Sequence, residues 1–353
     1  MKKIAVINLG STSTKVAYFE DDTCIVSRSI AHSAQEIGQF HDNWEQYDYR
    51  KKAILDFLQT NDVSLQQLDA FVSRGGHTEP VHSGVYRITE KMLEQSRSMR
   101  YGNHVSDLGI RLAYDLAPDK ACAFIVDSPC TDEYEPAARY SGLPEMPRQS
   151  RFHVLNQKAS ARAYCKEHGL EYAQTDLVVV HMGGGTSVAA HCHGRLIDGN
   201  NGLDGDGPFS TNRTGSLPVG ALVDLCYSGQ YTHEQMRKKI NGLGGLMAYV
   251  HDTDVLSVYN RAIAGDDDCK SALDAMIYQT AKEVGAMATV LCGRVNAIIL
   301  TGGIAYNEYI VEQIRARVGY IAPVYAYPGE REMESLGVQS YYALIGKEEV
   351  YEL

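Results

Sequence analysis

A glycine-rich turn between two apolar runs is the first part of this sequence whose residue types suggest chemistry. Residues 177–180 are apolar and mostly β-branched, which is typical of a strand buried on both faces, and a second strand begins at Thr186. The turn holds three glycines whose backbone N–H groups can approach an anion closely: Gly183, Gly184 and Gly185. We predict a phosphate-binding hairpin here. Glycines that only permit positive φ in a tight turn would produce the same pattern.

The N-terminal residues repeat this pattern. Apolar residues 4–7 lead into Asn8, a short turn of Gly, Ser and Thr, and a second apolar run. Asn8 takes the place of His181 in the other hairpin, at an offset near half the chain, which indicates an internal duplication. Two related halves with one hairpin each predict a nucleotide bound in a cleft between them. The segment is no Walker loop, because Lys15 has no glycine before it and no helix start follows.

Two arginines stand in glycine-flanked loops, where their planar guanidinium groups suit phosphate and carboxylate oxygens. They are Arg74 in SRGGH and Arg213 in NRTG. Phosphoryl transfer to an anion brings two negative reactants together, so its catalysis rests on positioning and on cations. We predict that both arginines provide this positive charge. Surface salt bridges are the alternative role for each.

Carboxylates and a second glycine turn add to the predicted site. Asp127 ends a buried strand and Glu332 begins a late helix, so either side chain is a candidate ligand of Mg²⁺. A turn residue at Asp127 and a helix-dipole charge at Glu332 are the alternatives. Gly302 and Gly303 follow another strand and precede a helix that begins at Asn307, an arrangement that offers backbone donors to a nucleotide.

Four histidines also deserve comparison. We expect His153 and His181 to lie near phosphate, although a single histidine is more often structural. His191 and His193 lie two apart on a strand and would face the same side, so a metal site is conceivable. The sequence offers no third ligand near them.

The composition limits the class of protein. The chain has 353 residues, 44% of them hydrophobic and 22% charged, and a net charge of −11. Its length allows two domains, and its charge argues against a nucleic-acid or anionic-membrane surface. The eight cysteines form no C-x-x-C pair and no apolar stretch is long enough to span a bilayer, so we predict a soluble, cytoplasmic protein.

Hydrophobic periodicity predicts an α/β chain. Expected strands beyond the two hairpins are residues 23–30, 68–73, 121–126, 297–300 and 324–327. Expected helices are residues 44–58, 88–99, 106–116, 155–168, 221–227, 233–240, 271–291, 307–318 and 332–345. In helix 44–58 we place the basic residues on the outer face, and in helix 271–291 small residues such as Gly285 suit close packing.

A proline-rich segment over residues 129–147 suggests the domain boundary. We expect the last helix to return to the first half of the chain. The predicted domains are therefore residues 1–127 plus 332–353, and residues 128–331.

Seven motifs, taken in order along the chain, resemble those of the butyrate kinases. They are VINLGSTSTK, SRGGH, the pair Phe152-His153, HMGGGTS, GPFSTNRTG, LTGGIAYN and PGEREME. These enzymes form part of the acetate kinase family, within the actin/hexokinase/Hsp70 superfamily of ATPases. The resemblance implies two duplicated ribonuclease H-like, or actin-like ATPase, domains with a central interdomain cleft that holds ATP.

The resemblance also implies roles for individual residues. Arg74 and Arg213 would be the transition-state cations, His181 would touch the transferring phosphoryl group and His153 would order the site. Asp127 and Glu332 would serve Mg²⁺, with Glu330 as an alternative because the register of PGEREME is ambiguous. The predicted contacts to phosphate and nucleotide are Asn8, Ser11, Thr12, Gly183, Gly184, Gly185, Thr186, Gly302, Gly303 and Asn307.

The chain departs from acetate kinases at two positions. Gln157 replaces the second histidine of their FHGTSH motif, so that histidine's role is absent. Gly76 replaces a branched aliphatic residue, which would leave room for a longer acyl tail beside Phe152. Butanoate or a branched short acid is therefore favoured over acetate, with a broad preference because one methylene discriminates by only about 1–3 kcal/mol.

The predicted reaction is a reversible, Mg-ATP-dependent phosphorylation of a short-chain carboxylate, which yields an acyl phosphate and ADP. A carboxylate is already ionised at neutral pH, since carboxyl pKa values lie near ~4, so no general base is required. The alternatives are an acetate or propionate kinase, a sugar kinase that would use Asp127 as its base, and a nucleotide-switched binding protein. A homodimer or higher homo-oligomer is expected, and neither nucleic acid nor membrane is an expected partner.

Overall fold

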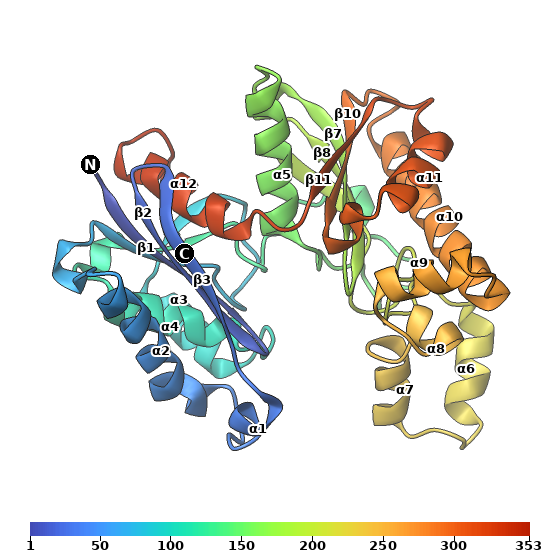
Figure 1. Cartoon of the computed structure of the whole chain (residues 1–353), viewed down its shortest axis with the longest axis horizontal. Coiled ribbons are helices and arrows are strands. Elements are labelled where there is room, and N and C mark those ends of the chain that lie inside the picture. Colours follow the sequence, from blue (N-terminus) through green and yellow to red (C-terminus); the bar gives the residue numbers. More distant parts are fainter. The chain divides into compact units, whose positions relative to one another are not determined.

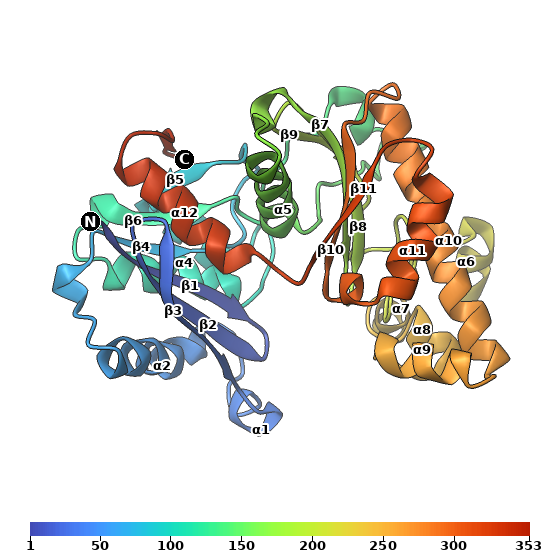
Figure 2. The same ribbon diagram turned by 45° about the horizontal axis from the view of Figure 1, so that its top comes forward.

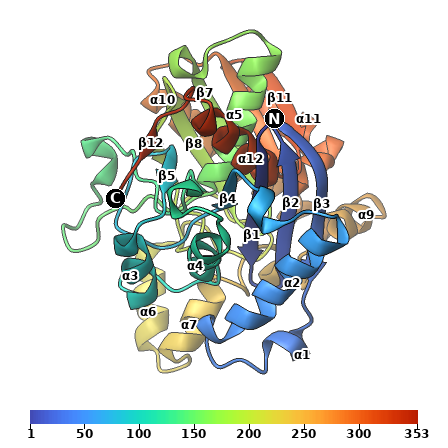
Figure 3. The ribbon, with the colours of Figure 1, turned by 90° about the vertical axis from the view of Figure 1, so that its left-hand side faces the viewer.

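The computed structural model describes all 353 residues (Figures 1, 2 and 3). It divides into two compact units, each built on its own β-sheet. Unit 1 comprises Met1–Asp132 and Arg331–Leu353, and unit 2 comprises Glu133–Glu330. No helix in either unit combines the length and apolar character that a membrane crossing requires.

The sheet of unit 1 has seven strands in the order β12-β5-β6-β4-β1-β2-β3. Strands β1, β2 and β3 form an antiparallel meander, and β4 and β6 run parallel to β1. The strands are β1 (Lys3–Gly10), β2 (Ser13–Glu20), β3 (Thr23–Ala31), β4 (Ala70–Ser73), β5 (Val85–Arg87), β6 (Ala123–Val126) and β12 (Val350–Tyr351).

The sheet of unit 2 has five strands in the order β11-β10-β7-β8-β9. Its strands are β7 (Asp176–Met182), β8 (Thr186–Cys192), β9 (Arg195–Gly199), β10 (Ala297–Gly302) and β11 (Val324–Pro328). Here too the first three strands are antiparallel and the next two run parallel to the first. Five strands therefore share one arrangement, β3-β2-β1-β4-β6 in unit 1 and β9-β8-β7-β10-β11 in unit 2, which confirms the duplicated ribonuclease H-like fold.

Helices cover both faces of the sheet in unit 1 (Figure 2). Tyr18 and Phe19 are neighbours on β2, so their side chains point to opposite faces. Tyr18 belongs to the core that includes α2 and α4, whereas Phe19 meets Gly337 of α12. The helices are α1 (Ala34–Ile37), α2 (Tyr47–Thr60), α3 (Glu90–Ser98), α4 (Ser106–Leu116) and α12 (Glu332–Leu344).

Unit 2 repeats this layering. On β7, Val178 and Val180 face a core that includes α10 and α11, while Leu177 and Val179 face α5. This explains the uninterrupted apolar run in the sequence, because both faces of the strand are covered. The helices are α5 (Val154–Glu167), α6 (Val219–Tyr227), α7 (His233–Ile240), α8 (Leu246–Val250), α9 (Val255–Ile263), α10 (Asp267–Val290) and α11 (Glu308–Val318).

Most elements lie where the sequence predicted them, including both hairpins and the terminal helix, which packs on the sheet of unit 1. The sequence missed α1, α8, α9, β5, β9 and β12. All of these except α9 have five residues or fewer, too few to repeat a hydrophobic period. Close packing at Gly285 was a wrong prediction, because no atom lies within 4 Å of where its Cβ would stand.

The contact between α12 and β2 predicts opposite effects for two glycine substitutions. A Cβ at Gly337 would lie 2.6 Å from ring atoms of Phe19, so Gly337→Ala should lower the free energy of unfolding by about 1–3 kcal/mol through overpacking. Gly285→Ala, in open space on α10, should raise it by about 0.5–1 kcal/mol. Thermal unfolding of both variants tests this. A Gly337→Ala protein as stable as the parent would contradict the described packing of α12.

Candidate active site

The turn between β7 and β8 confirms the predicted hairpin and shows why it holds glycines. None of Gly183, Gly184 and Gly185 has positive φ, so the alternative explanation of the motif is wrong. Instead, a Cβ at Gly185 would lie 3.4 Å from both Arg213 Nη1 and His153 Cε1, and a Cβ at Gly183 would lie 3.2 Å from His181 Nε2. The glycines therefore let charged and aromatic side chains approach the turn closely.

The two histidines expected near phosphate lie against each other in unit 2. The rings of His153 and His181 stack with centroids 3.8 Å apart and planes 8° from parallel. His153 Nδ1 lies 2.9 Å from Ser187 Oγ, and His181 Nδ1 lies 2.8 Å from Asn156 Nδ2. Because two like charges at this separation repel, the stack favours at most one charged ring.

A buried network of hydrogen bonds holds the residues around the two stacked histidines in place. Asn156 Nδ2 also donates to Thr301 Oγ1 at 3.2 Å, which connects α5 to β10. Gln157 Nε2 donates to Ser187 Oγ at 2.9 Å, and Gln157 Oε1 lies 3.1 Å from His191 Nε2. The sequence motif identifies Gln157 only as the replacement of a histidine. In the structure it joins β8 to α5, and Asn156 was missed altogether.

Arg213 is a half-buried cation without an anionic partner. Its Nη1 donates to Asn212 Oδ1 at 2.9 Å, its Nε is buried without a hydrogen-bond partner, and no carboxylate forms an ion pair with it. Burial lowers the pKa of the Arg213 guanidinium, although an arginine stays protonated at neutral pH. The surface salt bridge that the sequence left open is therefore wrong for Arg213. A partly buried charge of this kind is stabilised when an anion binds.

A pocket of about 620 Å³ lies beside the glycine turn, entirely within unit 2. Gly183 and Gly184 line it from the hairpin, and Gly303 and Asn307 line it from the end of β10 and the start of α11. Its volume falls within the range of small-molecule sites. Further lining residues, which the sequence analysis did not identify, are Thr211, Asn212, Thr253, Asp254, Val255, Leu256, Ile304 and Tyr306.

The predicted glycine turn after β10 differs in detail from the expectation. Gly302 is the last residue of β10 and has φ +88. A Cβ there would lie 2.3 Å from the carbonyl oxygen of Met182, so the close packing of β10 on β7 requires a glycine at this position. A 3₁₀ turn begins at Gly303, and Asn307 caps α11 by accepting from the N–H of Ile310. Gly302 is thus absent from the pocket lining, whereas its two predicted companions are present.

Three predicted residues of unit 1 converge at the start of α12. Asn8 Nδ2 donates to Glu332 Oε2 at 2.6 Å, and Arg74 Nη2 lies 3.8 Å from Glu332 Oε1. Glu332 is only 5% exposed, whereas Glu330 is exposed. Of the two glutamates that the PGEREME motif offers for Mg²⁺, Glu332 is the one whose carboxylate contacts Asn8 and Arg74.

The turn between β1 and β2 is supported by a residue whose place was predicted wrongly. Arg50 of α2 is fully buried, not on the outer face of its helix. Its guanidinium donates to Ser13 O at 2.7 Å, Thr14 Oγ1 at 3.0 Å and Ser11 O at 3.3 Å. Burial lowers the pKa of Arg50 to about 10, so the group remains charged at neutral pH. These bonds hold the turn that contains Ser11 and Thr12.

Asp127 follows β6 with φ +43 and is almost completely buried. Its Oδ1 accepts from the N–H of Gly84 at 3.1 Å, and its own N–H donates to the carbonyl of Gly84 at 3.0 Å. These two bonds fix the direction of the carboxylate. They also give Asp127 part of the turn role that the sequence analysis named as the alternative.

The predicted free space beside Gly76 is absent. A Cβ on Gly76 would lie 2.3 Å from Asp107 Oδ1, because the start of α4 fills that side. Asp107 in turn accepts from the N–H groups of His77 and His104. The glycine is therefore explained by close approach of α4, and this correction removes the argument that it enlarges an acyl pocket. Phe152 stacks on Tyr134, with centroids 5.8 Å apart.

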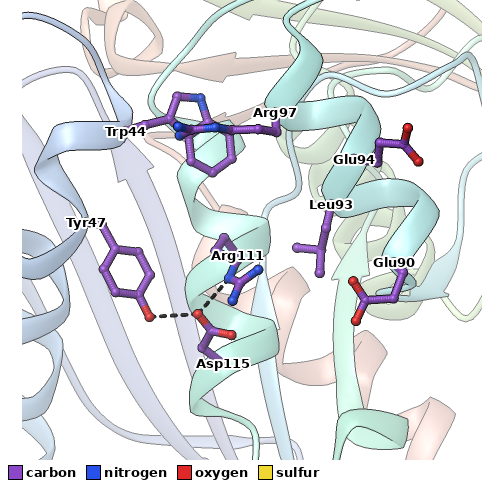
Figure 4. Close-up of a pocket in the computed structure, with 8 residues that line it drawn as sticks. All are labelled: Trp44, Tyr47, Glu90, Leu93, Glu94, Arg97, Arg111 and Asp115. Carbon is purple, nitrogen blue, oxygen red and sulfur yellow. Dashed lines mark hydrogen bonds and ion pairs between the residues drawn. The ribbon is translucent and has the colours of Figure 1, made fainter.

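A second pocket, of about 670 Å³, lies among α2, α3 and α4 of unit 1 (Figure 4). Its polar groups largely satisfy one another: Asp115 Oδ2 accepts from Tyr47 OH and Arg111 Nε, each at 2.7 Å. Arg97 covers the ring of Trp44. None of the predicted site residues lines this pocket, so it takes no part in the candidate site.

Taken together, the two sheets, which share a five-strand arrangement and each carry a polar hairpin turn, define a protein of duplicated actin-like ATPase architecture. The acetate kinase of Porphyromonas gingivalis has this fold: its crystal structure aligns with a TM-score of 0.79 at 18% identity, over 98% of this chain and 100% of that chain.

Sequence comparison identifies the family. A family model described as the acetokinase family matches residues 148–322. The chain is 46% identical to butyrate kinase 2 of Clostridium acetobutylicum, over 98% of each protein. It is 45% identical to butyrate kinase 1 of the same organism, over 100% of this chain and 99% of that protein. The chain belongs to the acetokinase family.

The network below the hairpin predicts a pH dependence of stability. His191 is fully buried, with Nδ1 2.8 Å from Tyr172 OH; burial, then the nearby Lys158 cation, lowers its pKa well below the usual value. Below pH ~6.5 the unfolded chain therefore binds a proton that the folded chain does not. The free energy of unfolding should fall there, by up to about 1.4 kcal/mol per pH unit from this group.

His191→Gln removes this titration, so its stability should depend less on pH than that of the parent below pH ~6.5. Urea unfolding across this range measures the difference. His251→Asn, at a site without these contacts, is the control and should follow the parent. Parallel pH profiles of parent and His191→Gln would contradict the assignment.

Proposed function

We propose that this chain transfers the γ-phosphoryl group of ATP to a short-chain carboxylate, butanoate or a branched short acid, and forms an acyl phosphate and ADP reversibly. The observation that carries the proposal is the half-buried guanidinium of Arg213, whose buried Nε has no hydrogen-bond partner, which pairs with no carboxylate and which lies against the glycine turn. Membership in the acetokinase family, and the names of the two Clostridium relatives, support this choice of acceptor.

In the proposed reaction both reactants are anions, so the barrier is lowered mainly by positive charge and by alignment. Arg213 of unit 2 and Arg74 of unit 1 would bind the acceptor and the transferring phosphoryl group. His181 would donate to a phosphoryl oxygen, and His153 would hold its ring in place. The acceptor is already ionised at neutral pH and needs no base.

The pocket beside the glycine turn supports a place for the nucleotide. Its lining from α9, Gly303 and Asn307 would receive the nucleoside, and the N–H groups of residues 183–185 would meet the phosphates. Thr186, Ser11 and Thr12 would add hydroxyl donors, and Gly302 would act only through strand packing. The cleft expected between the two halves stays a prediction, as do a cytoplasmic location and a homo-oligomeric state.

The residues of unit 1 fit the Mg²⁺ that such a reaction uses. Glu332, Asn8 and Asp127 provide carboxylate and amide oxygens, which are the donors this ion prefers. Glu332 Oε1 lies beyond hydrogen-bond distance of Arg74, so this oxygen is able to take another partner. When bound, the ion would supply positive charge to the phosphate oxygens.

Formation of acyl phosphate from a series of acids tests the function. We expect hydroxylamine to trap an acyl hydroxamate with straight and branched acids of two to five carbons, with the highest kcat/KM at butanoate or a branched short acid. Gly76 faces α4 and does not enlarge an acyl pocket. We therefore expect the kcat/KM values of acids that differ by one carbon to differ by no more than the ~10–200-fold that one methylene provides. If none of the acids gave a hydroxamate and the protein phosphorylated sugars, the sugar-kinase alternative would replace the proposal.

Arg213→Ala should lower kcat by about 10³-fold while nucleotide affinity stays nearly unchanged, because the cation acts on the charge that develops during transfer. Arg213→Lys should be intermediate, since a point charge replaces a planar fork. Arg315→Ala, at an exposed arginine of α11, is the matched control. Steady-state kinetics and nucleotide binding separate the two effects, and unchanged kcat in Arg213→Ala would refute the role.

Glu332→Gln should lower kcat by about 10²-fold and raise the Mg²⁺ concentration needed for half-maximal rate, because it removes a buried carboxylate charge. Activity measured against Mg²⁺ concentration tests this. Glu334→Gln, at an exposed position of the same helix, is the control and should match the parent. If Glu330→Gln were the variant with the raised requirement, the other register of PGEREME would hold the metal.

A further inference from the structure

Three side chains gather at the end of the unit 2 sheet opposite the glycine turn. Asp176 begins β7, Cys192 ends β8, and His193 is the first residue of the tight turn into β9. One oxygen of Asp176, Cys192 Sγ and one ring nitrogen of His193 all lie within 4.8 Å of one another. The glycine turn stands at the other end of β7, about 20 Å away at the usual rise per residue of a strand.

Asp176 carries an unused acceptor in this cluster. The residue is only 8% exposed, and its Oδ1 is buried without a hydrogen-bond partner. The same Oδ1 lies 3.7 Å from Nε2 of His193, so it points into the cluster. A buried carboxylate oxygen that accepts no hydrogen bond, and whose nearest ionisable partner is the exposed His193 ring, is poorly compensated, and a bound cation would improve this.

The main chain holds these residues in place. The N–H of Asp176 donates to Asn296 Oδ1 at 2.9 Å, and the N–H of Asn296 donates back to Asp176 O at 2.8 Å. Asp176 and Cys192 are paired across the β7–β8 ladder. The backbone therefore places the carboxylate and the sulfur side by side, and the exposed His193 side chain is able to adjust.

The donor set is that of a zinc ion. Thiolate, imidazole and carboxylate together suit Zn²⁺, whereas Mg²⁺ and Ca²⁺ prefer oxygen alone. With Zn–ligand bonds of about 2.0–2.3 Å, tetrahedral geometry requires ligand atoms roughly 3.3–3.8 Å apart. The carboxylate and the imidazole already meet this requirement.

We propose that Asp176, Cys192 and His193 form a Zn²⁺ site that ties the start of β7 to the β8–β9 turn, with water in the fourth position. From sequence alone, the candidate pair of ligands is His191 and His193. His191 is excluded, because it is fully buried and its ring nitrogens contact Tyr172 and Gln157. The site stabilises unit 2 and lies apart from the proposed reaction.

Metal binding to the full chain tests the proposal. The purified, reduced and chelator-treated protein is titrated with Zn²⁺ by calorimetry and with Co²⁺ by absorption. We expect one tight site per chain, a thiolate-to-cobalt charge-transfer band, visible bands of tetrahedral intensity, and a rise of several degrees in Tm with zinc. Absence of the charge-transfer band, or a cobalt spectrum of octahedral type, would overturn the site.

Two variants at the site have matched controls. His193→Asn keeps a residue that tolerates the φ of +47 at this turn, and Cys192→Ser replaces sulfur by oxygen. Each variant should lower the affinity for zinc by more than roughly 10–100-fold, which is the usual effect of losing a residue that only supports a metal ligand. His251→Asn, at another positive φ, and Cys226→Ser, at an exposed thiol elsewhere in unit 2, should bind like the parent. Equal binding by His193→Asn and the parent would refute the proposal, whatever acid the chain phosphorylates.

Discussion

The positive charge of Arg213 beside the glycine turn is the constraint on which the rest of unit 2 depends. A guanidinium that is partly removed from water without a carboxylate partner is costly, so its surroundings must hold it against the turn. The three glycines allow that approach because they have no side chains, and the stacked histidines close the same space from the other side. Unit 1 solves its electrostatic problem differently, since Arg74 shares Glu332 with Asn8.

Duplication explains why two such different half-sites occupy equivalent places. In both units the first strand carries a polar residue near its end, Asn8 or His181, and leads into a short turn, and the fourth strand runs beside it. The scaffold is thus repeated, but the supports of the turns are not: a buried arginine holds the first turn, whereas histidines and amides of α5 hold the second. Side-chain chemistry has diverged on a common backbone.

The sequence predicted the backbone better than the contacts. Alternating or continuous apolar runs identify strands, so both hairpins and most helices were predicted close to their observed bounds. Arg50 was predicted on the exposed face of its helix because helical periodicity shows only which residues share a face. It does not show that carbonyl groups from the β1–β2 turn contact that face. Gly76 was assigned free space because nothing in a local motif reveals that Asp107, some thirty positions later, fills it. Asn156 and Gln157 gained roles only once α5, β8 and β10 were adjacent.

The return of α12 to unit 1 has a consequence for biosynthesis. Glu332 and the glycine that packs on Phe19 lie near the C-terminal end of the chain, while their partners on β1 and β2 lie near its beginning. During synthesis, β1 to β6 leave the ribosome first. One face of their sheet stays uncovered until α12, near the end of the chain, has been synthesised. The later-made unit 2 is contiguous, so it has all its strands before unit 1 does, and the order of maturation runs opposite to the order of translation.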